Sequence, residues 1–163
     1  MIHLRTELQL LFLLLLANGS PVVTKKILGE RLARPLDGGL RMPDGRPLLG
    51  ASKTFRGLFF GVLLPTLGAP IIGLDWSIGF VVGGTAMAGD LLSSFLKRRL
   101  DLAPSSRALG LDQVPESLLP VIASAFLLKL SVLDAALITL AFFAGELALS
   151  YLLYKIHLRD RPY

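Results

Sequence analysis

Apolar residues run along this chain in long stretches that few polar residues interrupt. A helix crosses a bilayer with about 20 mostly apolar residues, and four stretches after residue 54 reach or approach this length. A fifth stretch lies near the N-terminus. The pattern predicts an all-α integral membrane protein in which five transmembrane helices form a bundle. The expected helices are residues 6–28, 55–74, 76–96, 116–133 and 135–156, and the long loops between them are 29–52 and 98–113.

The N-terminal stretch allows a second interpretation. Leu8 to Ala17 is a ten-residue apolar run that follows Arg5, and Ala17-Asn18-Gly19 could be the cleavage site of a signal peptide. Against this, Glu7 is out of place in the positive region of such a peptide, and the sequence is still apolar after Pro21. We therefore expect a first helix that is kinked near Pro21.

Composition supports a membrane protein and removes several kinds of chemistry. Hydrophobic residues make up 53% of the chain and charged residues 18%, whereas soluble domains have about 25% charged residues. This excludes a soluble globular domain and a disordered chain. The absence of cysteine excludes disulfides, a thiolate metal site and a cysteine nucleophile. His3 and His157 lie near opposite ends, which argues against a His-rich zinc site and a Ser-His-Asp triad.

The positive charges predict how the chain is oriented. Residues 25–56 carry eight Lys and Arg and residues 97–107 carry four, whereas the opposite side has only Arg5 and Lys129. Lys and Arg accumulate on the cytoplasmic side of membrane proteins. We expect a multi-pass protein of the cell membrane with its N-terminus outside, and with both long loops and the C-terminus in the cytoplasm. The basic loops are explained by the membrane, so no nucleic-acid partner is expected.

Asp90 is the polar residue that is hardest to explain by structure alone. It lies inside the cytoplasmic end of a predicted span, and an acid in a span is costly, at about 2.5–3.5 kcal/mol at the helix centre on insertion scales. Ser93, Ser94 and Lys97 follow at i+3, i+4 and i+7 and share its helical face. A function for Asp90 is favoured over a structural role, in which Asp90 would pair with Lys97 or bond to another helix. The triplet Lys97-Arg98-Arg99 is also typical of a positive anchor at the membrane surface.

Other polar groups are expected on the same side. Lys53 and Arg56 lie three residues apart at the start of the second helix, whose positive dipole end points into the same space. The Gly-rich loop before them lets backbone amides approach a phosphate. Asp112 and Glu116 lie at the start of the fourth helix, where a helix cap and a favourable dipole contact are open alternatives. Together these groups suit a metal-bound polyphosphate beside a lipid.

Five motifs follow one another along the chain. They are Pro35-x-Asp37-Gly38-Gly39, Asp44-Gly45-Arg46-x-Leu48-x-Gly50, Lys53-Thr54-Phe55-Arg56-Gly57, Gly89-Asp90-x-x-x-Ser94-Phe95-x-Lys97-Arg98-Arg99-Leu100 and Leu111-Asp112-Gln113. In this order they resemble the CDP-archaeol synthase family, which is related to the phosphatidate cytidylyltransferases. The motifs span roughly residues 17–120, and the family's five-helix plan matches the whole chain.

The resemblance implies a membrane nucleotidyltransferase that joins CTP to a lipid phosphate, releases pyrophosphate and leaves a CDP-activated lipid, using Mg²⁺. It implies catalytic roles for Asp90, Lys97 and Asp112, with Asp90 and Asp112 as metal ligands. It implies substrate binding by Asp37, Gly38, Gly39, Lys53, Thr54, Arg56, Ser94, Arg98, Arg99 and Gln113. Archaeal members act on a glycerol phosphate that carries two unsaturated ether-linked isoprenoid chains.

The chain departs from the family pattern at one point. The family reads Asp-Gln-Leu-Asp where this chain has Asp112-Gln113-Val114-Pro115, so the second acid is missing and Glu116 lies one position later. Glu116 either takes over as a metal ligand or is favourable only because it lies at a helix N-terminus, which is worth about 0.3–1 kcal/mol. The dipole interpretation is slightly favoured, and Glu116 is kept as a third candidate ligand.

The predicted chemistry is consistent with the residues present. A lipid phosphate is already anionic, so the reaction needs no general base and depends on positioning and electrostatics. A CDP-alcohol phosphotransferase is disfavoured because its spaced aspartates are absent. A non-enzymatic transporter, flippase or lipid-binding protein would not explain why acids sit beside basic residues on one side.

Two small-residue spacings bear on assembly. Gly57-x-x-x-Gly61 and Gly79-x-x-x-Gly83 let helices approach closely. Packing within one chain is favoured over a dimer interface, and a homo-oligomer stays an open alternative.

Overall fold

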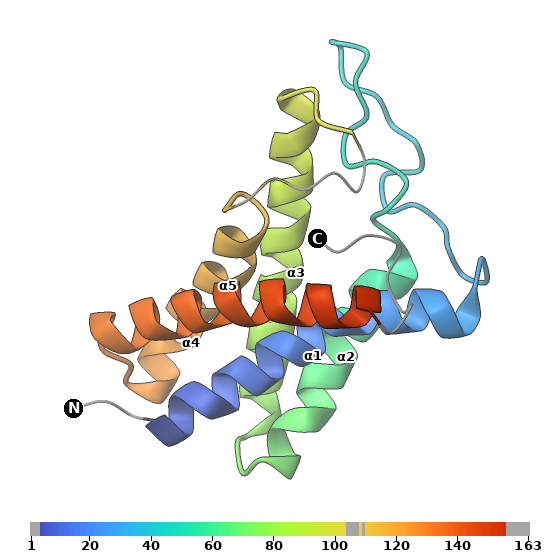
Figure 1. Cartoon of the computed structure of the whole chain (residues 1–163). Helices are drawn as coiled ribbons and strands as arrows, with labels where there is room; N and C mark the ends of the chain where they lie inside the picture. Colours follow the sequence, from blue (N-terminus) through green and yellow to red (C-terminus); the bar gives the residue numbers. More distant parts are fainter. Residues whose placement is uncertain (1–3, 104–107, 109, 156–163) are drawn as a thin grey trace.

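A computed structural model describes residues 4–103, 108 and 110–155. This part of the chain is built of helices and loops (Figure 1). The helices are α1 Leu4–Leu28, α2 Phe55–Ile71, α3 Trp76–Arg99, α4 Gln113–Leu128 and α5 Val132–Lys155. The predicted all-α fold is therefore confirmed.

α2 ends at Ile71 rather than at residue 74, and α3 continues to Arg99 rather than ending at residue 96. The ends of α4 and α5 also differ from those expected for the fourth and fifth spans. α4 begins at Gln113 and ends at Leu128, where Lys129 takes a left-handed conformation with φ 53°. α5 begins at Val132 because Ser131 and Asp134 cap it reciprocally. The Ser131 backbone N–H donates to Asp134 Oδ2 at 2.8 Å, and the Asp134 N–H donates to Ser131 Oγ at 3.2 Å. Hydropathy placed the break between these spans at residue 134, which lies in the first turn of α5.

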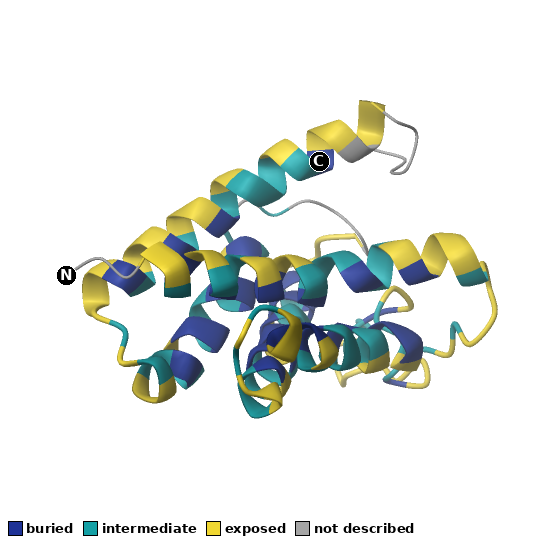
Figure 2. Cartoon of the chain, turned by 90° about the horizontal axis from the view of Figure 1, so that it is seen from below, coloured by how far each residue is buried: buried dark blue, intermediate teal, exposed yellow. Residues whose placement is uncertain are grey.

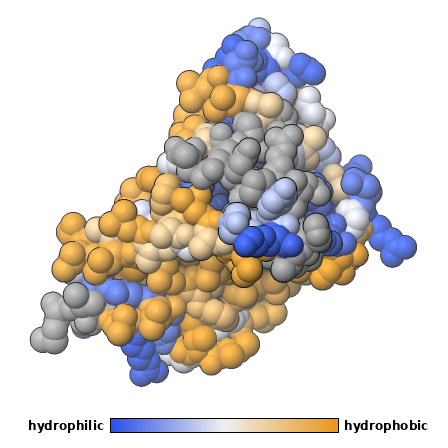
Figure 3. Space-filling model, in the orientation of Figure 1, coloured by the Kyte–Doolittle hydropathy of each residue, from blue (hydrophilic) through white to orange (hydrophobic). Residues whose placement is uncertain are grey.

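Three helices are long and apolar enough to cross a membrane. They are Leu4–Leu28, Trp76–Arg99 and Val132–Leu152. α2 and α4 are apolar but have 17 and 16 residues, at or below the usual lower limit of about 17. Figure 3 shows an apolar surface over much of the helical body and a hydrophilic tip beside the C-terminal end of α3. A membrane protein is supported, and five spans and their orientation stay predictions.

Small residues bring α2 and α3 into close contact. A Cβ atom at Gly79 would lie 2.2 Å from the Pro65 carbonyl oxygen, and one at Gly83 would lie 2.9 Å from the Gly61 carbonyl oxygen. Neither distance is possible for a real Cβ, so only glycine permits these contacts. The expected packing within one chain is therefore present.

The core lies where α1 meets the other helices. Leu10, Leu13 and Leu14 of α1 are buried with Val82 and Ala86 of α3. α1 continues through Pro21 and takes part in this core, as expected of a structural first helix. α5 packs against α4 and α1, and Figure 2 shows that much of its surface is exposed. This apolar, exposed surface is suited to contact with lipid.

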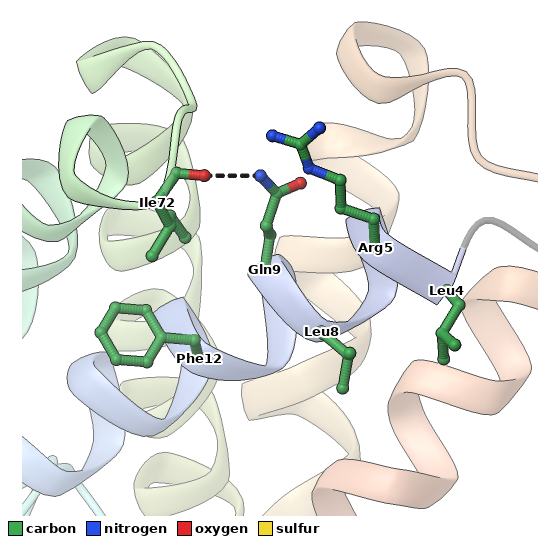
Figure 4. Close-up of a pocket in the computed structure, with 6 residues that line it drawn as sticks. All are labelled: Leu4, Arg5, Leu8, Gln9, Phe12 and Ile72. Carbon is green, nitrogen blue, oxygen red and sulfur yellow. Dashed lines mark hydrogen bonds between the residues drawn. The ribbon is translucent and has the colours of Figure 1, made fainter.

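An open groove of about 510 Å³ lies where the start of α1 meets the end of α2 (Figure 4). The Gln9 side chain donates from Nε2 to the Ile72 carbonyl oxygen at 2.7 Å across it. Its other lining residues are Leu4, Arg5, Leu8 and Phe12. None of the predicted site residues lines this groove, which lies at the opposite end of α2 from Lys53.

Candidate active site

In the loop between α1 and α2, residues 29–54, backbone hydrogen bonds join the first half of the loop to the second half. An isolated bridge joins Pro35 to Thr54, and the Leu36 N–H donates to the Lys53 carbonyl oxygen at 2.8 Å. Farther out, the Leu48 N–H donates to the Leu40 carbonyl oxygen at 2.9 Å. The two ends of this α1–α2 loop therefore lie side by side at the start of α2.

The Asp37 side chain links the two halves of the α1–α2 loop through hydrogen bonds to the backbone. Its Oδ1 accepts from the Gly39 N–H at 3.0 Å, and its Oδ2 accepts from the N–H groups of Leu49 and Gly50, each at 2.9 Å. Burial by itself raises the pKa of Asp37, but the bonds from Gly50, Leu49 and Gly39 outweigh it and hold the pKa below its usual range. Gly38, Gly39 and Gly50 have positive φ values, which this turn requires. Asp37, Gly38 and Gly39 thus shape the loop.

Lys53 emerges from this loop and pairs with Asp90 of α3. The Lys53 ammonium nitrogen lies 2.5 Å from Asp90 Oδ1, and the two side chains are 19% and 23% exposed. A small cavity of about 60 Å³ adjoins the pair, and Pro21 of α1 and Met87 of α3 are among its lining residues. The structural alternative of an Asp90–Lys97 pair is therefore wrong.

Lys97 pairs instead with Asp112 just before α4. Its ammonium nitrogen lies 2.6 Å from Asp112 Oδ1, and the side chains are 9% and 17% exposed. Asp112 Oδ2 accepts from the Ala108 N–H at 3.1 Å, and the side chain makes no capping bond to α4. Asp112 therefore occupies the N-cap position of α4, as one alternative expected, but its side chain does not cap the helix. The acids at 90 and 112 each have one lysine partner.

A close approach of α3 and α4 brings Glu116 to Asp90. A Cβ at Gly89 would lie 2.3 Å from the Pro115 carbonyl oxygen and 2.9 Å from Glu116 Cα, so only glycine fits there. Glu116 is buried, and its carboxyl group interacts directly with that of Asp90. Glu146 of α5 is also within electrostatic range of Glu116. The sequence placed Gly89 in a motif but did not predict that it allows the close approach of α4 to α3.

Two of the predicted phosphate-binding arginines have structural partners. Arg56 is buried and donates from Nη1 to the Gly29 and Arg31 carbonyl oxygens, at 2.8 and 2.6 Å, at the end of α1. Arg99 donates to Asp44 Oδ2 at 2.7 Å and to the Pro47 carbonyl oxygen at 2.6 Å. These bonds attach the α1–α2 loop to the ends of α1 and α3.

Arg98 has more buried donor atoms without a partner than these two arginines, in each of which Nε is the one such atom among the described residues. It is 4% exposed, and its Nη2 donates to the Ala103 carbonyl oxygen at 2.9 Å. Its Nε and Nη1 atoms have no hydrogen-bond partner among the described residues. Arg98 therefore keeps donor capacity that an anion could use.

The remaining predicted residues surround these pairs. Thr54 caps α2, because its Oγ1 accepts from the Gly57 N–H at 3.1 Å. Ser94 is buried on α3, one turn beyond Asp90. Gln113 Oε1 accepts from the Gly110 N–H at 2.9 Å. Ser93, which was expected on the same helical face as Asp90, is also buried, and its hydroxyl donates to the Gly89 carbonyl oxygen at 2.9 Å beside the α3–α4 contact.

Comparison with known proteins assigns the family. The family model described as CarS-like CDP-archaeol synthase matches residues 2–163. The chain belongs to the CDP-archaeol synthase family. The CDP-archaeol synthase of Sulfolobus acidocaldarius is 32% identical, with 91% of each chain covered. That of Pyrobaculum calidifontis is also 32% identical, with 96% of this chain and 99% of the relative covered.

A solved structure supports the same assignment. It is described as "Structural insight into an intramembrane enzyme for archaeal membrane lipids biosynthesis", and it is similar to this chain with a TM-score of 0.70 and 30% identity. The match covers 83% of this chain and 89% of that one. The predicted enzyme class of the CDP-archaeol synthases, a CTP-dependent cytidylyltransferase that activates a lipid phosphate, is confirmed. The alternative of a non-enzymatic transporter is not supported.

Proposed function

We propose that the two lysine–aspartate pairs mark the place where CTP meets the lipid phosphate. An oxygen of the lipid phosphate attacks the α-phosphorus of CTP and forms a new P–O bond. The bond from the α-phosphorus to the bridging oxygen breaks, and pyrophosphate leaves with that electron pair. The observation that carries this placement is that Lys53–Asp90 and Lys97–Asp112 lie along one face of the last turns of α3.

The lysines bind and orient the anions in this reaction. Both the triphosphate and the lipid phosphate are negative, so the main task is to hold them together and to neutralise the charge on the leaving pyrophosphate. Lys53 and Lys97 are suited to this, because each can exchange its carboxylate partner for a phosphate oxygen. Arg98 supplies further donors from a buried position beside Lys97.

The carboxylates are suited to hold Mg²⁺. Asp90 and Glu116 present oxygen ligands side by side, and Mg²⁺ is usually bound through one or two carboxylates together with waters and phosphates. No group of three acids or histidines converges within the part of the chain that the structure describes. The donor set therefore fits a metal ion that shares its ligands with CTP. When bound, Mg²⁺ would neutralise charge on the phosphates.

The two substrates are expected to reach the site from different sides, CTP from water and the lipid phosphate from the membrane. CTP would enter from the cytoplasm, which the basic α1–α2 loop and the C-terminal end of α3 face in the proposed orientation. The lipid, a glycerol phosphate with two ether-linked isoprenoid chains, would keep its chains among the apolar helices of the cell membrane. Its phosphate would then lie at the membrane surface beside Lys97.

The test supplies purified protein with Mg²⁺ and CTP labelled in its α-phosphate. A panel of lipid phosphates would differ in isoprenoid ether chains and acyl ester chains, and products would be identified by mass spectrometry. We expect label in a CDP-lipid made from the isoprenoid ether lipid, with pyrophosphate released in equal amount. Lys53→Ala should remove this activity, whereas Lys25→Ala, an exposed lysine of α1, should keep it. Label that stays in CTP with every lipid phosphate would contradict the proposal.

A further inference from the structure

The position of Lys53 depends on the shape of the α1–α2 loop. The Lys53 N–H donates to the Gly50 carbonyl oxygen at 3.2 Å, and its own carbonyl oxygen accepts from the Leu36 N–H at 2.8 Å. Its backbone is therefore held between Gly50 on one side and Leu36 on the other. Leu36 precedes Asp37 in the chain, and the Gly50 N–H donates to the Asp37 carboxylate.

Asp37 joins the two ends of the loop through one side chain. It is adjacent to Leu36, and its Oδ2 accepts from the N–H groups of Leu49 and Gly50, 12 and 13 residues later. The residue is 6% exposed, and both carboxylate oxygens accept bonds from backbone N–H groups. An ionised carboxylate accepts such bonds well, because hydrogen bonds to a charged group are roughly twice as strong as neutral ones.

We infer that Asp37 is a positioning residue, which closes the α1–α2 loop and thereby sets Lys53 against Asp90 without touching a substrate. This inference rests on the proposed function, because it assigns Asp37 an effect on CTP that passes through Lys53. It differs from the substrate-binding role expected for Asp37. Both oxygens of the buried carboxylate are bonded within the loop. The site residue that the same loop carries is Lys53, which pairs with Asp90.

The change Asp37→Asn isolates this effect. The asparagine has nearly the same shape, but its NH₂ group would face one side of the cluster of N–H donors and could accept no bond there. We expect the loop to loosen at Gly50 and Lys53 to leave its place beside Asp90. CTP binding should weaken by about tenfold in the full-length protein with Mg²⁺, a coupling within the range seen for residues in one network.

A double-mutant cycle separates positioning from direct contact. CTP binding would be measured for the unaltered protein, Asp37→Asn, Lys53→Ala and the double variant. If Asp37 acts through Lys53, the Asp37 change should weaken CTP binding by less than about twofold once Lys53 is absent. A further loss of about tenfold in the double variant would mean that Asp37 acts independently, and this would overturn the inference. Glu30→Gln, an exposed carboxylate of the same loop, should bind CTP normally.

A second variant guards against a folding defect. Gly50 has φ 96°, so Gly50→Ala strains the same junction while it leaves the Asp37 carboxylate in place. Gly50→Ala should reproduce the loss of CTP binding, again only when Lys53 is present. Normal CTP binding by Gly50→Ala or by folded Asp37→Asn would contradict the inference. Failure of the unaltered protein to bind CTP would instead contradict the proposed function from which it follows.

Discussion

The Lys53 ammonium group lies 2.5 Å from Oδ1 of Asp90, so a loop residue and an acid of α3 neutralise each other. The loop lysine is thereby held at the α3 surface, and the acid has a counterion within a largely apolar helix. The same contact means that a phosphate and Asp90 compete for one lysine. A cation and Lys53 likewise compete for one carboxylate.

This competition predicts two opposite effects of Asp90→Asn. Turnover should fall by at least about a hundredfold, because the proposed metal ligand is lost. CTP binding measured without Mg²⁺ should become tighter, because Lys53 no longer has a carboxylate partner. Equilibrium binding in the presence of a chelator, beside activity with Mg²⁺, measures both. Near-normal turnover would remove Asp90 from the metal site, and unchanged metal-free binding would show that Lys53 does not meet the nucleotide.

The Lys97–Asp112 pair predicts that removing one partner destabilises the protein more than removing both. Lys97→Met should lower the free energy of unfolding by about 2–3 kcal/mol, because it leaves a mostly buried Asp112 carboxylate without its counterion. The double change Lys97→Met with Asp112→Leu should recover much of this loss, since two apolar side chains need no counterion. Activity should stay low in both proteins. Thermal unfolding in detergent compares the single and the double variant. Equal stability of the two would argue against a coupled pair.

Arg56 and Lys53 should differ in what their removal does. Arg56 donates two bonds to carbonyl oxygens at the end of α1, whereas Lys53 pairs across to α3. Arg56→Ala is therefore expected to lower thermal stability and to keep CTP binding, while Lys53→Ala weakens CTP binding about tenfold or more. Measuring CTP affinity and thermal unfolding for both variants tests this. A folded Arg56→Ala protein that loses CTP binding as strongly as Lys53→Ala would restore the substrate role expected from the sequence.

The sequence predicted the helices well because long apolar stretches are a local signal. The start of α5 needed a further local signal, the Ser131–Asp134 reciprocal cap, which hydropathy does not contain. The site itself was harder, because its partners are far apart in sequence. Asp90 was expected to function, but its lysine partner comes from a loop 37 residues earlier.

Chain packing also decided which polar residues could act together. Gly89 looked like part of a motif, yet its effect is steric: it lets α4 come close enough for Glu116 to reach Asp90. Arg56 looked like a phosphate ligand because it follows Lys53 by three residues, which predicted one shared face at the start of the second helix. Its side chain instead satisfies carbonyl groups at the end of α1, a contact that no local pattern contains.

The proposed orientation can be tested with introduced thiols, because the chain has no cysteine. Arg41→Cys in the exposed tip of the α1–α2 loop should resist an impermeant thiol reagent in intact cells and react after lysis. Lys129→Cys in the turn between α4 and α5 should react in intact cells. The other loop position suited to this test, Ser105, lies outside the described residues. Labelling of Arg41→Cys from outside the cell would overturn the charge argument.

The last prediction concerns Glu116, which lies beside Asp90 although the family acid is missing at Pro115. A metal ligand and a favourable helix-dipole contact differ in what Glu116→Gln changes. As a ligand, Glu116 should give a variant whose Mg²⁺ titration of activity shifts to higher concentration, with turnover reduced at least about tenfold. As a dipole contact worth about 0.3–1 kcal/mol, it should change only thermal stability.

The contact with Asp90 favours the ligand role, so we expect the shifted titration. Asp112→Asn is the informative companion, because Asp112 pairs with Lys97 and its carboxylate is not part of the Asp90–Glu116 contact. It should lower turnover with a smaller shift in the Mg²⁺ requirement. If Asp112→Asn shifts the titration strongly and Glu116→Gln leaves it unmoved, the metal lies at the start of α4 with Asp112. Glu116 is then a buried acid that stabilises the contact between α3 and α4.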